Sequence, residues 1–282
     1  MHRIKFLTAT AVVLVVSATT AHAELVSDSY TAAFDNSNDG SQLFGSAWYQ
    51  TYNNEYSDLQ LVNDGQGGTR GSWESGIRRD IKSFDATFKF SFKQDAGGIG
   101  DGFAFLAGNL SNMSGNRWEG DERGINAFRE DAAGIAVGFD TYGADNETGI
   151  YNSWGNQLVA WDNAPNPSHY WNGATYQDYI AALNGGATAN ISWNINTGLS
   201  VTITWIDGQG GWNFTTEFFS WPDGLDTTDW GFGFAARNGG SPMDVIIDDF
   251  TVNYTYDDGV IPTPGTLALL ALGGVAARRR RG

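Results

Sequence analysis

Few residues of this chain have the chemistry of a catalytic centre. The 282 residues include three histidines and no cysteine, and His2 and His22 lie in an N-terminal segment that we expect to be removed. His169 is then the only histidine left, which argues against a Ser-His-Asp triad and a histidine-rich metal centre. The lack of cysteine excludes a thiolate metal site, a cysteine nucleophile and a disulfide scaffold.

Carboxylates are abundant, but no catalytic pair is evident. A glycosidase needs two carboxylates roughly 5 to 9.5 Å apart across the scissile bond. The nearest approach is Glu119-Gly-Asp121-Glu122, which lies among Gly, Arg and Asn and is typical of a solvated loop. We therefore predict that the chain is not an enzyme. A polysaccharide-degrading hydrolase or lyase remains the alternative.

Two aspartates at the ends of apolar runs indicate a different kind of site. Asp101 lies in a Gly-Asp-Gly turn before the run Gly102 to Ala107, and Asp140 ends the run Gly134 to Asp140. Each is either a ligand-binding carboxylate or a turn residue that caps its own backbone. The turn around Asp101 predicts an exposed side chain whose replacement costs little stability.

The elements that position these aspartates are expected to be strands. Apolar residues alternate with polar ones along Phe84 to Lys93, Leu199 to Trp205 and Phe250 to Thr255, which predicts strands with one buried face. The two runs that carry Asp101 and Asp140 are apolar on both faces, as in central strands. Trp230 to Phe234 alternates large residues with glycine, which suits a strand approached closely by another backbone.

The composition favours one all-β domain. Gly at 37 residues, aromatics at 14% and charged residues at 17% disfavour a helical bundle or a charge-rich disordered chain. Many short strands separated by turn clusters, such as Asn63 to Gly68 and Asn238 to Gly240, predict an antiparallel β-sandwich with jelly-roll connections over residues 24–259. A turn or two of helix is expected near residues 176–183. Residues 152–179, rich in Trp and Tyr, are expected to form a long loop over the binding end.

The N-terminal segment predicts export. Residues 1–23 run from a basic start through an apolar stretch to Ala21-His22-Ala23, which is typical of a cleaved signal peptide. An uncleaved anchor is the alternative. The mature chain is expected to begin at Glu24.

The C-terminal segment, residues 260–282, joins a Pro-Thr-Pro motif to the apolar run Leu267 to Ala277 and four arginines. It resembles the PEP-CTERM sorting signals of Gram-negative bacteria, with Thr263 where Glu is usual. The resemblance implies an extracellular or outer-surface location in a Gram-negative-type bacterium, with membrane contact only through this tail before processing. A weak membrane tether is the alternative, because the apolar run is shorter than the roughly 20 residues that a transmembrane helix needs.

The net charge restricts the partners. The formal charge is -16, and without the six basic residues of the two ends the body carries 10 basic against 32 acidic residues, or -22. Such a surface repels polyanions, so we predict no nucleic-acid partner, and it can collect divalent cations.

Three segments in order resemble the L-type (legume-type) lectin domain, including the lectin-like domains of bacterial surface proteins. They are the Phe-rich run before Gly100-Asp101-Gly102-Phe103-Ala104-Phe105, the run ending in Phe139-Asp140-Thr141-Tyr142, and the glycine-rich segment Gly233 to Gly240. The match extends over most of residues 25–256. It implies a concanavalin A-like jelly roll that binds glycan or polysaccharide.

The resemblance also implies site residues. Asp101, Gly102, Gly124 and Asn146 would bind carbohydrate, with Asp101 accepting bonds from two sugar hydroxyls. Asp140, Tyr142, Asp145 and Asn146 would hold a calcium ion through oxygen ligands.

Some positions depart from the family's pattern. Gly138 stands where the family has a metal-binding Glu, which disfavours a transition metal, and Ala144 stands where it has Asn. A single calcium site and a domain without metal therefore both remain open. A structural or adhesive matrix protein that uses the fold without a sugar site is the remaining alternative function.

Overall fold

The computed structural model describes residues 25–34, 39–52, 55–93, 100–110, 134–140, 148–152, 186–205, 211–215 and 226–259. These ranges contain strands and no helix, so they include no helix that is long and apolar enough to cross a membrane. The strands are β1 Leu25–Thr31, β2 Gln42–Gly45, β3 Trp48–Tyr52, β4 Glu55–Val62, β5 Arg70–Glu74, β6 Asp80–Lys93, β7 Gly102–Gly108, β8 Gly134–Asp140, β9 Thr148–Asn152, β10 Ala187–Asn194, β11 Gly198–Trp205, β12 Gly211–Thr215, β13 Gly231–Arg237 and β14 Asp244–Asp257.

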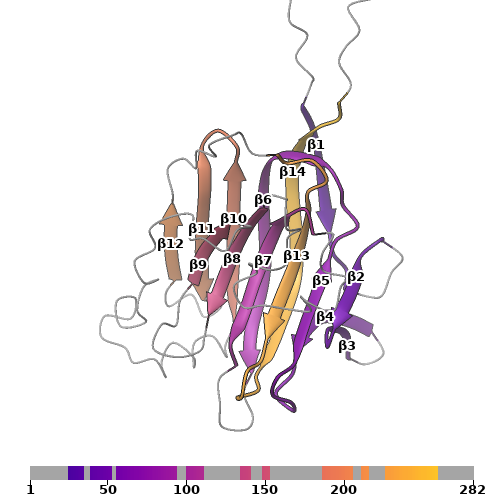
Figure 1. Cartoon of the computed structure of the whole chain (residues 1–282), viewed down its shortest axis with the longest axis vertical. Helices are drawn as coiled ribbons and strands as arrows, with labels where there is room; N and C mark the ends of the chain where they lie inside the picture. Colours follow the sequence, from indigo (N-terminus) through magenta and orange to yellow (C-terminus); the bar gives the residue numbers. More distant parts are fainter. Residues whose placement is uncertain are drawn as a thin grey trace, which may run out of the picture. The chain divides into compact units, whose positions relative to one another are not determined.

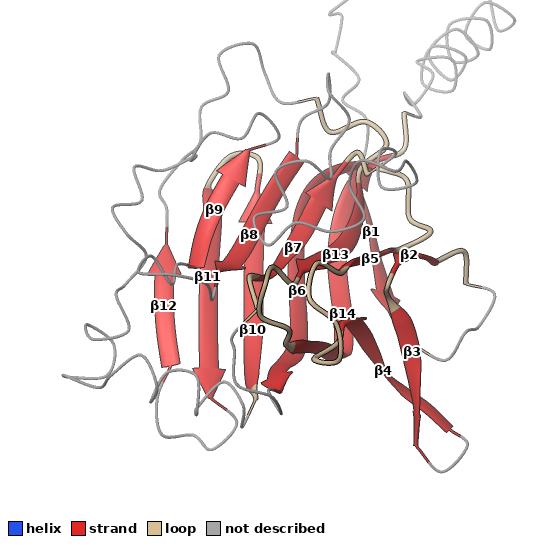
Figure 2. Cartoon of the chain, turned by 60° about the horizontal axis from the view of Figure 1, so that its bottom comes forward, coloured by secondary structure: helices blue, strands red, loops and turns tan. Residues whose placement is uncertain are grey.

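Leu25–Asp258 forms a compact unit of two antiparallel sheets that stack face to face (Figures 1 and 2). The eight-stranded sheet has the order β12-β11-β10-β6-β14-β4-β3, with β1 also paired to β14, and the six-stranded sheet has the order β2-β5-β13-β7-β8-β9. Neighbouring strands such as β6 and β14 are distant in sequence, as jelly-roll connections require. The predicted antiparallel sandwich is confirmed.

The alternating segments form the strands that they predict. The apolar side chains of β6, from Phe84 to Phe92, are at most 2% exposed and point into the space between the sheets. The third alternating segment is only the second half of β14, which is 14 residues long. Its register shifts between Asp248 and Thr251, and Asp249 has a φ of 51°. This bulge moves the buried positions from odd to even numbers, which is why the first half did not continue the predicted pattern.

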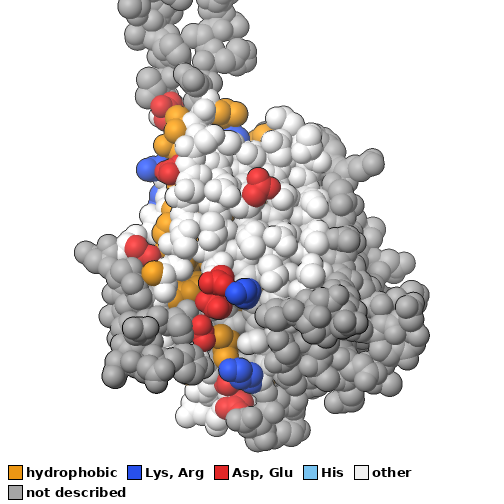
Figure 3. Space-filling model, turned by 180° about the vertical axis from the view of Figure 1, so that it is seen from behind, with side chains coloured by type: hydrophobic (Ala, Val, Ile, Leu, Met, Phe, Trp, Pro, Cys, Tyr) orange, Lys and Arg blue, Asp and Glu red, His pale blue; other side chains and the backbone are white. Residues whose placement is uncertain are grey.

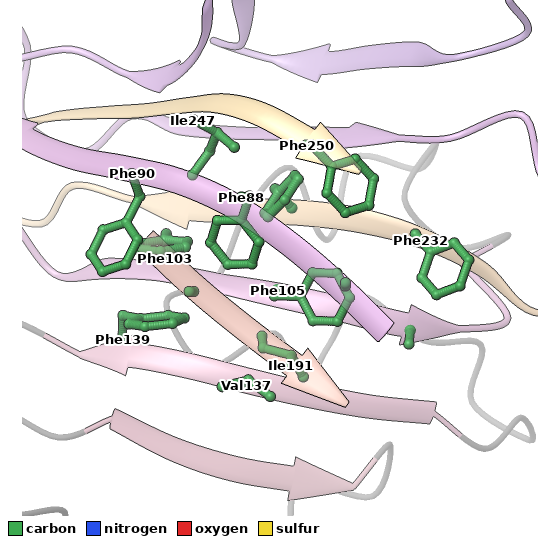
Figure 4. Packing of buried hydrophobic residues seen from close by; sticks show 14 of the residues in the cluster. Phe88, Phe90, Phe103, Phe105, Val137, Phe139, Ile191, Phe232, Ile247 and Phe250 are labelled. Carbon is green, nitrogen blue, oxygen red and sulfur yellow. The ribbon is translucent and has the colours of Figure 1, made fainter. Parts of the chain in front are cut away.

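Aromatic rings from both sheets fill the core (Figure 4). Phe103 of β7 and Phe139 of β8 stack with ring centroids 4.3 Å apart, and Phe88 of β6 meets Phe234 of β13 edge-on at 4.9 Å. Each such pair stabilises the fold by about 0.5–1.5 kcal/mol beyond the burial of its area. The contacts between β6 and β13 join the two sheets and fix the position of the six-stranded sheet.

The six-stranded sheet is covered on its outer face as well. Ala104 and Leu106 of β7, Ala136 of β8 and Ala235 of β13 point away from the central core, and each is at most 1% exposed. The prediction of strands apolar on both faces is confirmed here. The predicted close approach of another backbone to β13 is also confirmed, because a Cβ on Gly233 would lie 2.7 Å from the carbonyl oxygen of Trp73.

Three predictions concern segments outside the described residues. These are the helical turns near residues 176–183, the aromatic loop after Asn152, and the acidic group Glu119-Gly-Asp121-Glu122.

Candidate functional site

Three strands meet at one end of the six-stranded sheet. Gly102, the first residue of β7, pairs with Asp140 at the end of β8 and with Arg237 at the end of β13. Antiparallel pairing therefore brings the turn with Asp101, the end of β8 and the loop after β13 to the same edge. The structure thus places the backbones of the two aspartates that the sequence singled out close to each other.

Asp101 is buried and paired. The residue is 4% exposed, and its Oδ2 lies 2.5 Å from Nε of Arg237, whose side chain is 34% exposed. The backbone N–H of Asp101 also donates to the carbonyl of Arg237 at 3.2 Å. The prediction of an exposed turn carboxylate is therefore wrong. A neighbouring strand end supplies the counter-charge that a buried carboxylate requires.

The loop after β13 closes over this carboxylate. A Cβ built on Gly239 would lie 2.5 Å from Oδ1 and 3.1 Å from Oδ2 of Asp101. Any side chain at position 239 would push the loop away from Asp101. Glycine is needed here because the backbone itself forms one wall of the carboxylate's surroundings.

Asn238 ties this loop to the loop between β4 and β5. Its side chain is fully buried, and Nδ2 donates to the carbonyls of Asn63 at 2.8 Å and Met243 at 2.9 Å. Its backbone N–H donates to the carbonyl of Thr69 at 2.9 Å. Its Oδ1 faces Gly100, where a Cβ would lie only 2.1 Å away, and has no hydrogen-bond partner among the residues described. Asn238 thus fixes the loop after β13 to the loop between β4 and β5, beside the Asp101 turn.

Asp244 makes a second connection between the same loops. Its Oδ1 accepts hydrogen bonds from Nε2 of Gln60 at 2.7 Å and from the backbone N–H of Asp64 at 2.8 Å. Together with Asn238, it holds the loop of residues 63–69 against the start of β14. The Asp101 turn therefore lies in rigid surroundings.

Comparison with solved structures relates this arrangement of sheets to plant lectins. The Lotus tetragonolobus seed lectin superposes with a TM-score of 0.59 at 16% identity, covering 82% of this chain and 98% of that one. Arcelin-5, a lectin-like defence protein of Phaseolus vulgaris, gives 0.58 at 15% identity, with 82% and 99% covered. A winged bean acidic lectin complexed with methyl-α-D-galactose gives 0.55 at 14% identity, with 82% and 99% covered.

The fold is that of the legume lectins. The likeness is one of structure, because no protein-family model and no curated protein matches the sequence. The expected concanavalin A-like architecture is confirmed at the level of fold.

The structure describes some of the predicted site residues. Gly102 is buried directly beside Asp101, with a φ of 123°. Asp140 is placed through its backbone. Gly124, Tyr142, Asp145 and Asn146 lie outside the described residues. In the described ranges, no group of three or more His, Cys, Asp or Glu side chains could hold a metal ion.

Sequence reasoning missed Arg237, Asn238 and Gly239 as parts of the site. All three fall within the glycine-rich segment that carries the lectin resemblance. The sequence therefore indicated the segment but not the roles of these residues. Arg237 could have been noticed because basic residues are scarce: residues 24–259 contain 10 basic and 32 acidic residues. An arginine at a strand end beside a glycine loop is then a candidate partner for a buried acid.

A second buried carboxylate lies elsewhere on the same sheet. Glu74 of β5 is 5% exposed, and its Oε1 lies 2.9 Å from Nη2 of Arg78. Burial raises the pKa of Glu74 above its usual range, although Arg78 acts in the opposite direction. Neither its Oε2 nor Oγ of Ser72 has a hydrogen-bond partner in the described part of the chain. Glu74 is therefore a buried titrating group of the fold.

Proposed function

We propose that this protein binds carbohydrate, without catalysis, at the end of the six-stranded sheet where Asp101 lies. The observation that carries the proposal is the buried Asp101 carboxylate, fixed by Arg237 and Gly239 beside the end of β8. The lectin fold supports it, since one protein of that fold was solved in complex with methyl-α-D-galactose.

The chemistry of the site suits hydroxyl groups. An ionised carboxylate offers about four acceptor positions, of which Arg237 uses one through its Nε. Sugar hydroxyls would donate to the remaining positions, with backbone groups of Gly102 and Gly124 and the amide of Asn146 completing the contacts. Because Asn238 and Asp244 hold the loops beside Asp101, this part of the site needs little ordering on binding, which favours affinity.

We propose that the segment that follows β8 binds a calcium ion. Asp140, Tyr142, Asp145 and Asn146 would supply carboxylate, carbonyl and amide oxygens, which are the ligands that calcium prefers. The ion would fix the chain after β8 so that Asn146 faces the same sugar as Asp101.

Glycan-array screening followed by calorimetry with Asp101→Asn tests the proposal. The variant should lose at least tenfold in affinity, because hydrogen bonds to a charged group contribute roughly 1.5–3 kcal/mol each. The matched control is Asp229→Asn, since Asp229 is exposed and has a φ of 60° that asparagine also adopts. A folded Asp101→Asn variant that binds as tightly as the wild type would show that the site is misplaced.

A structural or adhesive protein is the second candidate. The burial of Asp101 and its ion pair with Arg237 favour it, because the pair could serve the fold alone. In that case no glycan binds the wild type, with or without calcium, and Asp101→Asn changes only stability.

We also propose that the protein is exported, with residues 1–23 removed as a signal peptide and residues 260–282 used in sorting to the outer surface. Mass spectrometry of the protein recovered from the surface fraction tests this location. A mature chain that begins at Glu24 is expected, and a chain retaining Met1 in the cytoplasm would contradict it.

A further inference from the structure

The outer face of the eight-stranded sheet carries an extended field of small polar side chains. The residues that alternate with the core positions of β1, β14, β6, β10 and β11 are mostly Ser, Thr and Asn. Figure 3 views this side of the molecule, and much of its described surface is white, with most charged side chains along one edge and below the centre and one acidic side chain alone within the white area.

The register places these side chains in two rows, the first across five strands and the second across four. Pairing of β1, β14, β6, β10 and β11 aligns the first row as Ser29, Asn253, Asp85, Ser192 and Ser200. The adjacent row, two residues along each strand, consists of Ser27, Thr255, Ser83 and Asn194. Side chains within a row point to the same face, because each lies opposite the next in the ladder.

The surface is hollowed along these rows. One groove, of about 430 Å³, lies over β1, β14 and β6, and a second, of about 440 Å³, lies over β6, β10 and β11. Both grooves are lined by Ser83 and Asp85, so they lie side by side, and we call the two together the cross-strand trough. Four strand spacings give it a length of about 19 Å.

The walls of the trough are ordered by hydrogen bonds between strands. Oγ of Ser83 and Oγ1 of Thr255 lie 2.6 Å apart within the second row. Immediately beside the trough, Oγ1 of Thr87 donates to Oδ1 of Asn190 at 2.9 Å. The side chain of Asp85, by contrast, is exposed and makes no hydrogen bond or ion pair with another described side chain. The trough thus has fixed hydroxyl groups around one available carboxylate.

We infer that the cross-strand trough is a second carbohydrate-binding site, which takes an extended, uncharged polysaccharide chain lying across the strands. Hydroxyls and amides both donate and accept hydrogen bonds, and the carboxylate of Asp85 accepts them, as sugar hydroxyls require. The trough crosses five strands, so it is long enough for several sugar units. The site is independent of the one proposed at Asp101, which lies on the other sheet.

Other occupants fit the trough less well. Among the described residues that line it, the charged ones are Asp28 and Asp85 and none is Lys or Arg, which disfavours polyanions. Its apolar lining residues, Trp193, Leu199 and Tyr254, are at most 5% exposed, which disfavours a lipid or an apolar peptide. A second copy of the chain would bring two Asp85 carboxylates toward each other across the interface.

Affinity electrophoresis in native gels that contain soluble polysaccharide tests the inference. Dextran, xyloglucan and galactomannan are the uncharged probes, and alginate is the polyanionic control. At least one uncharged polymer should retard the wild type, and alginate should not. Asp85→Ala combined with Asn253→Ala should weaken this retardation at least fivefold in apparent Kd, after correction for mobility in a polymer-free gel.

Both substituted side chains are exposed, so the variant should fold. Thr204→Ala is the matched control, because Thr204 is an exposed hydroxyl on the same face outside the trough, and it should bind as the wild type does.

Several results would overturn the inference. These are no retardation by any uncharged polymer, equal retardation of the double variant, or a dimer in sedimentation that Asp85→Ala dissociates. Retardation that Asp101→Asn abolishes and the double variant retains would assign all binding to the proposed site, which would then stand without the trough. Retardation that the double variant abolishes and Asp101→Asn retains would support the trough and contradict the site proposed at Asp101.

Discussion

The ion pair between Asp101 and Arg237 joins a buried residue to a partly exposed one. The side chain of Asp101 is 5% exposed and that of Arg237 is 34% exposed. Arg237→Ala leaves a buried carboxylate without its counter-charge, which costs roughly 3 kcal/mol or more. Asp101→Ala leaves a guanidinium that can turn to water, and should cost only about 1–2 kcal/mol. Urea unfolding of both variants measures the difference, and equal losses would show that the pair is not the stabilising feature of the turn.

Glu74 should make stability depend on pH in a defined direction. Burial raises the pKa of Glu74 above its usual value of about 4.5, so the folded protein binds the proton more tightly than the unfolded chain. The stability from this group is fully present below about pH 4.5 and is lost as the pH rises through the folded-state pKa.

Glu74→Gln removes that titration. The melting temperature of the variant relative to the wild type should therefore rise between pH 4 and pH 7. A constant difference across that range would mean that Glu74 titrates normally, with Arg78 balancing its burial.

The candidate site could be predicted only in part at the level of single residues. The Gly-Asp-Gly turn before an apolar run correctly indicated that Asp101 directly precedes a buried strand. Its burial could not be predicted, because the counter-charge comes from Arg237, 136 positions later. The fully buried amide of Asn238 looked like an ordinary turn residue, since its partners Asn63 and Met243 are specified only by the folded loops.

Within the elements, period-two alternation predicted β6 and β11 because one face of each strand packs on the core. It predicted only half of β14, since the bulge at Asp248 and Asp249 reverses which positions are buried. Short strands such as β2 and β3 have too few alternating residues to give a pattern.

The bulge in β14 provides a prediction about backbone strain. Asp249 has a φ of 51°, its side chain is exposed, and it pairs with Lys89. Asp249→Gly and Asp249→Val both remove this pair, so the difference between them isolates the backbone conformation. The valine variant should be less stable than the glycine variant by about 1–2 kcal/mol, because a β-branched residue is strained there. Equal stability in thermal unfolding would mean that the bulge relaxes to accept valine.

At the scale of the whole molecule, the class of fold followed from composition and alternation, and the strand order did not. The neighbours of β6 are β10 and β14, which lie far along the chain, and pairing over such distances leaves no local mark in the sequence. The cross-strand trough depends on that order. Its polar residues come from five strands, and they form rows only through the register of the folded sheet.

The last prediction concerns the C-terminal segment. All residues of the described hydrophobic core lie between Ala32 and Tyr254, and the acidic body ends where a short apolar run and four arginines begin. We therefore expect residues 260–282 to act in sorting and to add nothing to the stability of the sandwich. A chain of residues 24–259 should melt within about 2 °C of a chain of residues 24–282, since 1 kcal/mol shifts the melting temperature of a domain this size by roughly 2–4 °C. A loss of several degrees on removing the segment would show that it packs on the sandwich, and the same pair of chains in the polysaccharide gels would then show whether it also affects binding.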